Sequence, residues 1–219
     1  MARIAEDLLL LLLDNPDAQP ALDRSALSRV LAAALILDLA YECRVRPAQP
    51  NEPVAAGELI ALAGPVPMDP AVRPALSMFE QGPLSARAAI AKLRKRAEDD
   101  VLDQLLRTGE LHQIQLSSHR LRRNTYAWPL PDRVRVDQIR AAAFAALFER
   151  RRPDPVTAAV VGLLYRVGGL APALHLHDEA AQRAVLAAEV IAEGRWPDTS
   201  RTDEVNLALT AAVILPELG

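Results

Sequence analysis

The sequence is poor in several residue types that organise other kinds of fold. Cys43 is the single cysteine, so a disulfide within the chain is excluded, and we expect it to be a small buried hydrophobe rather than a reactive thiol. Aromatic residues make up only 4% of the chain. Leu, Ala, Val and Ile must therefore fill the core, which suits closely approaching helices better than a β-sandwich. No apolar run reaches the roughly 20 residues that a membrane-spanning helix needs.

The remaining composition is that of an ordinary globular domain. The 219 residues are 51% apolar and 24% charged, which predicts a single domain over residues 1–219 with a sizeable core. The six leucines of residues 8–13 follow Glu6 and Asp7, and they are too few for a secretory signal. We therefore expect a cytoplasmic protein.

The longest apolar stretch predicts the centre of the fold. Within residues 25–46, only Asp38 is polar between Val30 and Ala40, and a helix that is apolar on all sides must lie inside other helices. Ser25 is the expected N-cap. The predicted fold class is mostly α: a central buried helix in a helical bundle ringed by amphipathic helices, with one or two small β-hairpins.

The other predicted elements follow from hydrophobic spacing and from proline and glycine positions. Helices are expected over residues 4–13, 71–80, 85–106, 133–150, 156–167, 177–193 and 202–214. Strands are expected at residues 44–46 and 57–62, forming one hairpin, and at residues 111–116 and 121–128, forming a second. The helix over residues 85–106 is expected to be continuous and to end at Gly109.

Catalytic and metal-binding patterns are weak. His175 and His177 have metal-like spacing, but no third ligand is near in the sequence, and Asp178 is expected to cap the next helix instead. A carboxylate such as Asp38 is more often a structural acceptor for backbone amides than a tuned acid. No catalytic residue, metal site or cofactor is therefore predicted.

The basic residues are concentrated in one region. Between residues 84 and 135, eleven cations minus six acids leave a surplus of five, in a chain whose total charge is −3. Such a region can attract an anionic membrane or a nucleic-acid backbone, or it can be a solvated face with helical ion pairs. Tyr126 and Trp128 are either interfacial anchors or residues that pack the hairpin onto the bundle.

Several passages together resemble the Golgi phosphoprotein 3 family, in the family's order and over nearly the whole chain. They are Glu6-Asp7-Leu8-Leu9-Leu10, residues 34–40 with Arg44-Val45, residues 101–106 before Gly109, Gly162-Leu163-Leu164-Tyr165, and Thr202-Asp203-Glu204-Val205. The resemblance implies a central helical bundle with a protruding hairpin and no enzymatic activity. It also implies binding of phosphatidylinositol 4-phosphate at membranes.

The family's lipid pocket transfers to this chain only in part. Its tryptophan falls near Leu22 or Asp23, its helix arginine falls on Ala32, and its arginine pair falls near Lys95 and Glu98. Only Lys95 keeps the positive charge.

Other cations are expected to replace the missing ones. Arg29 lies one turn before Ala32, and Arg94 and Arg96 flank Lys95, so the predicted headgroup-binding residues are Arg29, Arg94, Lys95 and Arg96. The predicted membrane contacts at the second hairpin are Arg120, Leu121, Arg122 and Arg123, where the family has an apolar tip that enters the membrane or a neighbouring subunit. A basic tip favours shallow electrostatic docking, and the hairpin also allows a homo-oligomer.

The predicted function is therefore that of a cytoplasmic, peripherally membrane-associated protein without enzymatic activity. Its expected partner is an anionic, phosphoinositide-like lipid headgroup. One alternative is a winged-helix-like nucleic-acid-binding protein, because a basic helix followed by a hairpin is typical of that module, although the acidic total charge disfavours it. Another alternative is an adaptor for the cytoplasmic tails of membrane enzymes.

Overall fold

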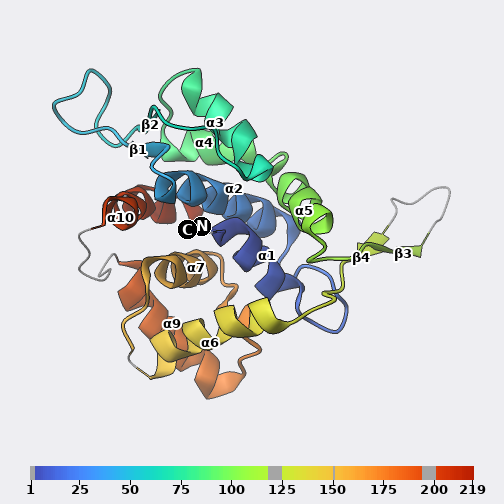
Figure 1. Ribbon diagram of the computed structural model, residues 1–219. Coiled ribbons are helices and arrows are strands. Elements are labelled where there is room, and N and C mark those ends of the chain that lie inside the picture. The colour runs from blue at the N-terminus through green and yellow to red at the C-terminus, as the bar shows by residue number, and fades with distance from the viewer. Residues whose placement is uncertain (1–2, 118–124, 150, 194–200) are drawn as a thin grey trace.

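The protein is mostly α-helical and is built around one central helix (Figure 1). The computed structural model describes residues 3–117, 125–149, 151–193 and 201–219. The helices are α1 (Ile4–Leu13), α2 (Arg24–Tyr41), α3 (Arg73–Glu80), α4 (Ala86–Leu93), α5 (Ala97–Thr108), α6 (Val134–Phe148), α7 (Pro155–Arg166), α8 (Leu170–Leu174), α9 (Asp178–Ala192) and α10 (Thr202–Ile214). The strands are β1 (Val45–Pro47), β2 (Leu59–Ala61), β3 (Ile114–Ser117) and β4 (Thr125–Ala127), and the 3-10 turns are η1 (Pro70–Val72) and η2 (Leu215–Leu218).

Helix α2 is the hub of the core, as predicted. Leu35 and Leu39 are 1% and 0% exposed, and every residue from Val30 to Ala40 is buried. Helices α1, α4, α5, α7 and α10 all pack against it, and Figure 1 shows it between the α3–α4 pair and the α6–α7–α9 group. Because its neighbours cover all its faces, the all-round apolar sequence needs no lipid.

The N-cap of α2 is Asp23 and not Ser25. An Asp23 carboxylate oxygen accepts hydrogen bonds from the backbone amides of Ser25 and Ala26, at 2.8 and 3.0 Å. Ser25 therefore lies inside the first turn. Both residue types cap helices well, and the helix begins at the earlier of the two.

The helix predicted over residues 85–106 is in fact two helices, so the prediction of one continuous helix is wrong. Residues 94–96 separate α4 from α5, and Arg96 has φ −136°. A straight helix of this length would measure about 33 Å, longer than the about 27 Å of α2. Because packed helices cross at an angle, such a straight helix would contact α2 over only a short segment. The bend allows both Ile90 of α4 and Val101 of α5 to be buried against the core.

The two predicted hairpins are present. Strands β1 and β2 pair with Val45 opposite Ala61. Strands β3 and β4 pair with Ile114 opposite Ala127 and project from the side of the bundle (Figure 1), and residues 121–124 of the predicted second strand lie outside the described residues. Trp128 is partly buried against the core, and its backbone amide donates to the Ala18 carbonyl oxygen at 2.7 Å. The base of this hairpin is therefore attached to the loop that follows α1.

Helices α6, α7 and α9 form the lower layer in Figure 1, where α7 packs against α6 and α9. Helix α8 is not among the predicted elements, because it has only five residues and contains Pro172. The prediction that Asp178 caps α9 is wrong: His177 is the N-cap, and Asp178 is the first helical residue. Cys43 is half-buried rather than fully buried, at a left-handed position with φ 54° just after α2.

Asn206 of α10 joins three elements through its buried amide. Its Nδ2 donates to the Val45 carbonyl oxygen at 2.8 Å and to that of Ala40, at the end of α2. We expect Asn206→Leu to lower the free energy of unfolding by about 1–3 kcal/mol, because buried carbonyl groups lose their donor. Urea unfolding measures this loss. Asn206→Asp, which has a similar shape but no donor, should cost at least as much, and a loss only for the leucine variant would contradict the explanation.

Candidate functional site

Three of the predicted headgroup-binding residues lie together at the bend between α4 and α5. Arg94, Lys95 and Arg96 are consecutive and exposed. The Arg96 guanidinium donates two hydrogen bonds to the Asp100 carboxylate, both at 2.7 Å. Arg94 and Lys95 have no side-chain hydrogen bond or ion pair to any residue that the structure describes. The bend therefore presents two uncommitted cations beside a third that is held in place.

Arg29, the fourth predicted residue, is turned toward another part of the molecule. Its Nη1 donates to the Leu218 carbonyl oxygen of η2 at 3.3 Å. Its Nε is buried and has no hydrogen-bond partner within the described ranges. The neighbouring residue of that turn, Glu217, is ion-paired with Arg87 of α4 at 2.8 Å. Arg29 thus lies by the turn that bridges α2 and α4, with part of its hydrogen-bonding capacity unused.

A cation that was not predicted acts on the first turn of α5. Burial raises the pKa of Glu98 in the first turn of α5, and the positive charge of Arg24 lowers it. The first residue of α2 therefore faces the first turn of α5. Spacing within α2 favoured Arg29, since it lies one turn from Ala32. The side of α2 that faces α5 depends on the angle at which the two helices cross. The sequence does not specify this angle, so it could not identify Arg24 as a neighbour of α5.

The basic surplus of residues 84–135 is smaller on the surface than in the sequence, because four of its cations form ion pairs. These are Arg87 with Glu217, Arg96 with Asp100, Arg133 with Asp14, and Arg135 with Glu6, Asp7 and Glu110. Two of the paired arginines come from the start of α6: Arg135 is partly buried among its acids, whereas Arg133 stays 58% exposed at its side chain. Among the described residues of this region, the exposed cations without an ion pair are Lys92, Arg94 and Lys95, at or next to the α4–α5 bend, and Arg107 at the other end of α5.

The predicted contacts at the hairpin tip, Arg120, Leu121, Arg122 and Arg123, lie outside the described residues. Below the tip, Ile114 and Leu116 of β3 are 50% and 54% exposed, and the pairing of β3 with β4 is irregular between Gln115 and Ser117. The rings of Tyr126 and Trp128 are 6.3 Å apart between centroids. Trp128 packs against the bundle, as the structural interpretation of this aromatic pair predicts.

Asp38 has the predicted structural role. Its two carboxylate oxygens accept hydrogen bonds from the backbone amides of Ile4 and Ala5, at 2.6 and 3.0 Å. Burial raises the pKa of Asp38 well above its usual value, and the two amide hydrogen bonds oppose this shift. The side chain therefore acts as a cap for α1 from a distant point in the sequence, since the first amides of a helix have no partner within it.

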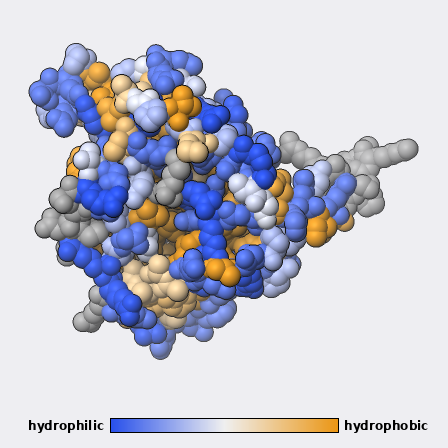
Figure 2. Space-filling model, viewed as in Figure 1, coloured by the Kyte–Doolittle hydropathy of each residue, from blue (hydrophilic) through white to orange (hydrophobic). Residues whose placement is uncertain are grey.

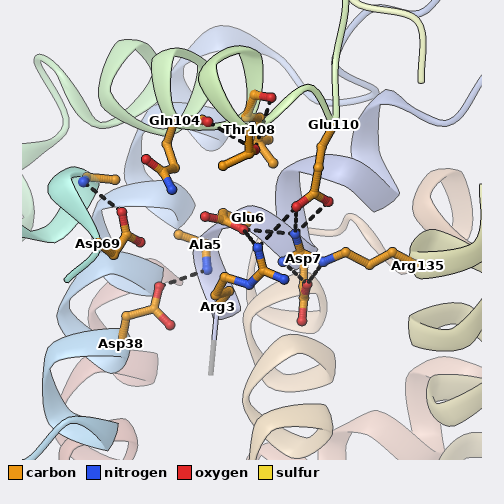
Figure 3. A network of polar contacts seen from close by, with 12 residues as sticks. Arg3, Ala5, Glu6, Asp7, Asp38, Asp69, Gln104, Thr108, Glu110 and Arg135 are labelled. Atoms are coloured by element: carbon orange, nitrogen blue, oxygen red, sulfur yellow. Dashed lines mark hydrogen bonds and ion pairs between the residues drawn. The ribbon is translucent and has the colours of Figure 1, made fainter. Parts of the chain in front are cut away.

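A network of charged side chains surrounds the same end of α1 (Figure 3). The Arg135 guanidinium lies 2.8 Å from Glu6, 2.5 Å from Asp7 and 2.6 Å from Glu110. Burial lowers the pKa of Arg135, but the hydrogen bond with Glu110 and the charges of Asp7 and Glu6 outweigh it and raise the pKa. Burial likewise raises the pKa of Glu6 and of Asp7, and Arg135 opposes both shifts. These groups stabilise one another and are not free for catalysis.

The metal-like spacing of His175 and His177 is not matched by further ligands among the described residues. His175 Nε2 lies 2.7 Å from the Asp14 carbonyl oxygen, so this nitrogen is committed to the backbone. The described residues contain no group of three or more His, Cys, Asp or Glu side chains placed to hold a metal ion.

The described helices include none with the length and apolarity needed to cross a membrane. On the face seen in Figure 2, apolar side chains form small separate patches among hydrophilic ones. Exposed cations such as those at the bend can contact a negatively charged surface. Small apolar patches do not require deep insertion into that surface.

Comparison with protein families matches the model described as Golgi phosphoprotein 3 (GPP34) to residues 4–214. This range begins at the first residue of α1 and ends at the last residue of α10, so the match covers the whole helical architecture rather than one motif. No curated protein matches the sequence.

Proposed function

The chain belongs to the Golgi phosphoprotein 3 family, and from this membership we propose that it is a non-enzymatic peripheral membrane protein that binds an anionic lipid headgroup. The proposed ligand is phosphoinositide-like, as the family resemblance implies. The proposed binding residues are Arg94, Lys95 and Arg96 at the α4–α5 bend, with Arg29, beside the η2 turn, as a further cation.

The observation that supports this proposal is the interruption of a helix at three consecutive exposed cations. Each Lys or Arg near an anionic membrane surface contributes about 1 kcal/mol, so Arg94 and Lys95 together contribute about 2 kcal/mol. That energy alone gives weak, reversible docking. An arginine can also bind a phosphate with two parallel hydrogen bonds, and Arg94 has its guanidinium free for this within the described structure. A multiply charged headgroup would therefore bind better than a singly charged one.

Arg29 has a separate place in the proposal. Its guanidinium already donates to Leu218 of η2, at the long distance of 3.3 Å. A phosphate oxygen is a stronger acceptor than a backbone carbonyl, because the hydrogen bond is then assisted by charge. A headgroup near the start of α2 would therefore compete well for Arg29.

Vesicle flotation tests the proposal. The vesicles contain phosphatidylcholine alone or with phosphatidylinositol 4-phosphate, phosphatidylglycerol or cardiolipin. We expect binding to the anionic vesicles, and we expect Arg94→Ser with Lys95→Ser to weaken it by about tenfold or more, which corresponds to about 1.4 kcal/mol or more. Arg29→Ala should have a smaller effect, because this residue is already engaged.

Arg107→Ser is the matched control, since Arg107 is another exposed cation of α5 at the opposite end from the bend. Its flotation should match that of the unchanged protein. Equal binding of the double variant and the control would reject the bend as the headgroup site. Absence of flotation with every anionic lipid would reject the function.

The winged-helix alternative is less well supported by the geometry. A recognition helix enters the major groove as one continuous helix, whereas the cations of this chain lie where α4 and α5 separate. We expect no electrophoretic shift of random duplex DNA at low salt. The adaptor role for membrane-enzyme tails stays a prediction, and it is compatible with lipid docking.

A further inference from the structure

A groove of about 740 Å³ lies at the opposite end of α1 from the charged network. It is bounded by the loop after α1, the short helix α8, the connection to α9 and the start of α6. Its apolar lining consists of Pro16, Ala171, Pro172 and Leu176. Small-ligand sites measure about 300–1,000 Å³ and combine an apolar lining with a few polar groups. No lining residue belongs to α4 or α5, so the groove is distinct from the proposed lipid site.

The polar groups of the groove include one largely uncommitted cation. The Asp14 carboxylate accepts hydrogen bonds from Arg133 at 2.8 Å and from Arg140 at 2.5 Å. Arg140 is also paired with Asp137 at 3.2 Å. Arg133 is 58% exposed at its side chain, and Asp14 is its one partner in the described part of the chain. A guanidinium has five N–H donors, so Arg133 can still bind an anion.

The other polar lining groups differ in availability. The Asn15 amide is used within its own loop, where Nδ2 donates to the carbonyl oxygens of Leu12 and Gln19. His177 is exposed, and its side chain makes no capping hydrogen bond to α9. Its imidazole, beside Arg133 in the lining, can therefore donate to the same anion.

The backbone around the groove is held in an unusual conformation. His175 and Asp178, which bracket Leu176 and His177, have φ values of 53° and 43°, and Ala18 in the loop after α1 has φ 48°. Left-handed conformations of residues other than glycine cost about 1–2 kcal/mol each. They persist where the surrounding structure enforces them, and they cluster at ligand sites. The conformation of the connection between α8 and α9 places Leu176 and His177 in the groove.

We propose that this groove binds a small amphiphile that carries one carboxylate or sulfonate group. The apolar body of the ligand lies against Pro16, Pro172 and Leu176. The anionic group accepts hydrogen bonds from Arg133 and His177. This site does not depend on the proposed lipid-binding function.

Fluorescence titration of the full chain with 1-anilinonaphthalene-8-sulfonate tests the site, because this probe has an aromatic body and one anionic group. We expect saturable binding with one site per chain. Ala171→Trp should weaken binding at least tenfold by filling the groove. Arg133→Gln should weaken it about fivefold to tenfold by removing the anion contact, while Asp14 keeps Arg140 as its partner.

Two controls make the result specific. Leu186→Ser changes the exposed apolar face of α9, an alternative surface for adsorption of the probe, and it should leave the affinity unchanged. Decanoate should displace the probe at least tenfold better than decanol, which has the same chain without the charge. Circular dichroism checks that each variant is folded, and His177→Trp at the exposed rim replaces Ala171→Trp if that variant does not fold.

Three outcomes would overturn the proposal. The first is unchanged probe affinity in the folded groove-filling variant. The second is loss of binding in Leu186→Ser. The third is equal displacement by decanol and decanoate, which would reject an anionic ligand. Since α4 and α5 are untouched, flotation on anionic vesicles should be the same in all these variants, so failure here is distinguishable from failure of the proposed function.

Discussion

Replacing Arg135 with methionine is expected to lower the free energy of unfolding by about 3–5 kcal/mol, as is typical when one partner of a buried ion pair is removed. The reason is that one guanidinium pairs with three carboxylates, those of Glu6, Asp7 and Glu110. Glu6 is only 2% exposed at its side chain, so water cannot replace the lost partner. Arg3, which also lies 3.0 Å from Glu6 and from Glu110, is left as the remaining cation. Urea unfolding at neutral pH measures the loss.

The pH dependence of this loss distinguishes lost charge pairing from lost packing. Burial already raises the pKa of Glu6 and of Asp7, and Arg135 opposes the shift, so removing Arg135 raises both further. A carboxyl whose pKa is higher in the folded protein than in the unfolded chain loses its stabilising contribution as pH rises. The Arg135→Met deficit should therefore be smallest near about pH 4 and grow toward neutral pH.

Arg107→Met is the control for this experiment, because Arg107 is exposed and the described structure gives it no ion pair. It should change the stability by less than about 0.5 kcal/mol. A deficit of the same size at every pH would show that the stem of Arg135, and not its charge, supports the fold.

The helices with strong local signals could be predicted from the sequence. Helix α1 ends where Asn15 and Pro16 follow six leucines, and its predicted bounds match the structure. The apolar run from Val30 to Ala40 likewise predicts that its helix is buried at the centre of the fold, because the helix has no polar face to expose to water. These elements are determined by residues within the element itself.

The helix break at residues 94–96 could not be predicted in this way. Arg and Lys are good helix formers, and the apolar stripe continues across the break from Ile90 to Val101. The chain bends because both halves must pack on α2, which is a property of the tertiary structure. The bend also contains the candidate lipid site. The sequence therefore identifies the cations of that site, but it does not show that they lie at a bend.

The charged groups at the start of α1 illustrate the same limit. The structural role of Asp38 is predicted by its apolar surroundings in the sequence, but its partners lie 34 and 33 residues away. Arg135 belongs to the basic surplus of residues 84–135 when the sequence is considered alone. In the structure it lies among acids 128 and 129 residues away. Counting charges along a segment therefore overstated the positive surface of this protein.

Asp38→Ala is expected to lower the free energy of unfolding by about 2–6 kcal/mol, since each of two buried amides loses its acceptor and each such loss costs about 1–3 kcal/mol. Ile4 and Ala5 are 0% and 2% exposed, so water has little access to their amides. Asp17→Ala, at an exposed position in the loop after α1, is the control and should change stability by less than about 0.5 kcal/mol. Urea unfolding compares the two variants.

Asp38→Asn separates the hydrogen bonds of this residue from its charge. Its amide oxygen can accept from only one of the two α1 amides, because an NH2 group takes the place of the second acceptor, so it should recover at most about half of the stability that alanine loses. Because burial raises the pKa of Asp38 well above its usual value, the folded protein binds this proton more tightly than the unfolded chain does. The contribution of Asp38 is then fully present below about pH 3.9 and is lost as pH rises through the raised pKa. Asparagine does not titrate, so the stability of Asp38→Asn relative to the unchanged protein should increase with pH. Parallel pH profiles for the two proteins would show that Asp38 stays ionised in the fold, and that the two amides of α1 outweigh its burial.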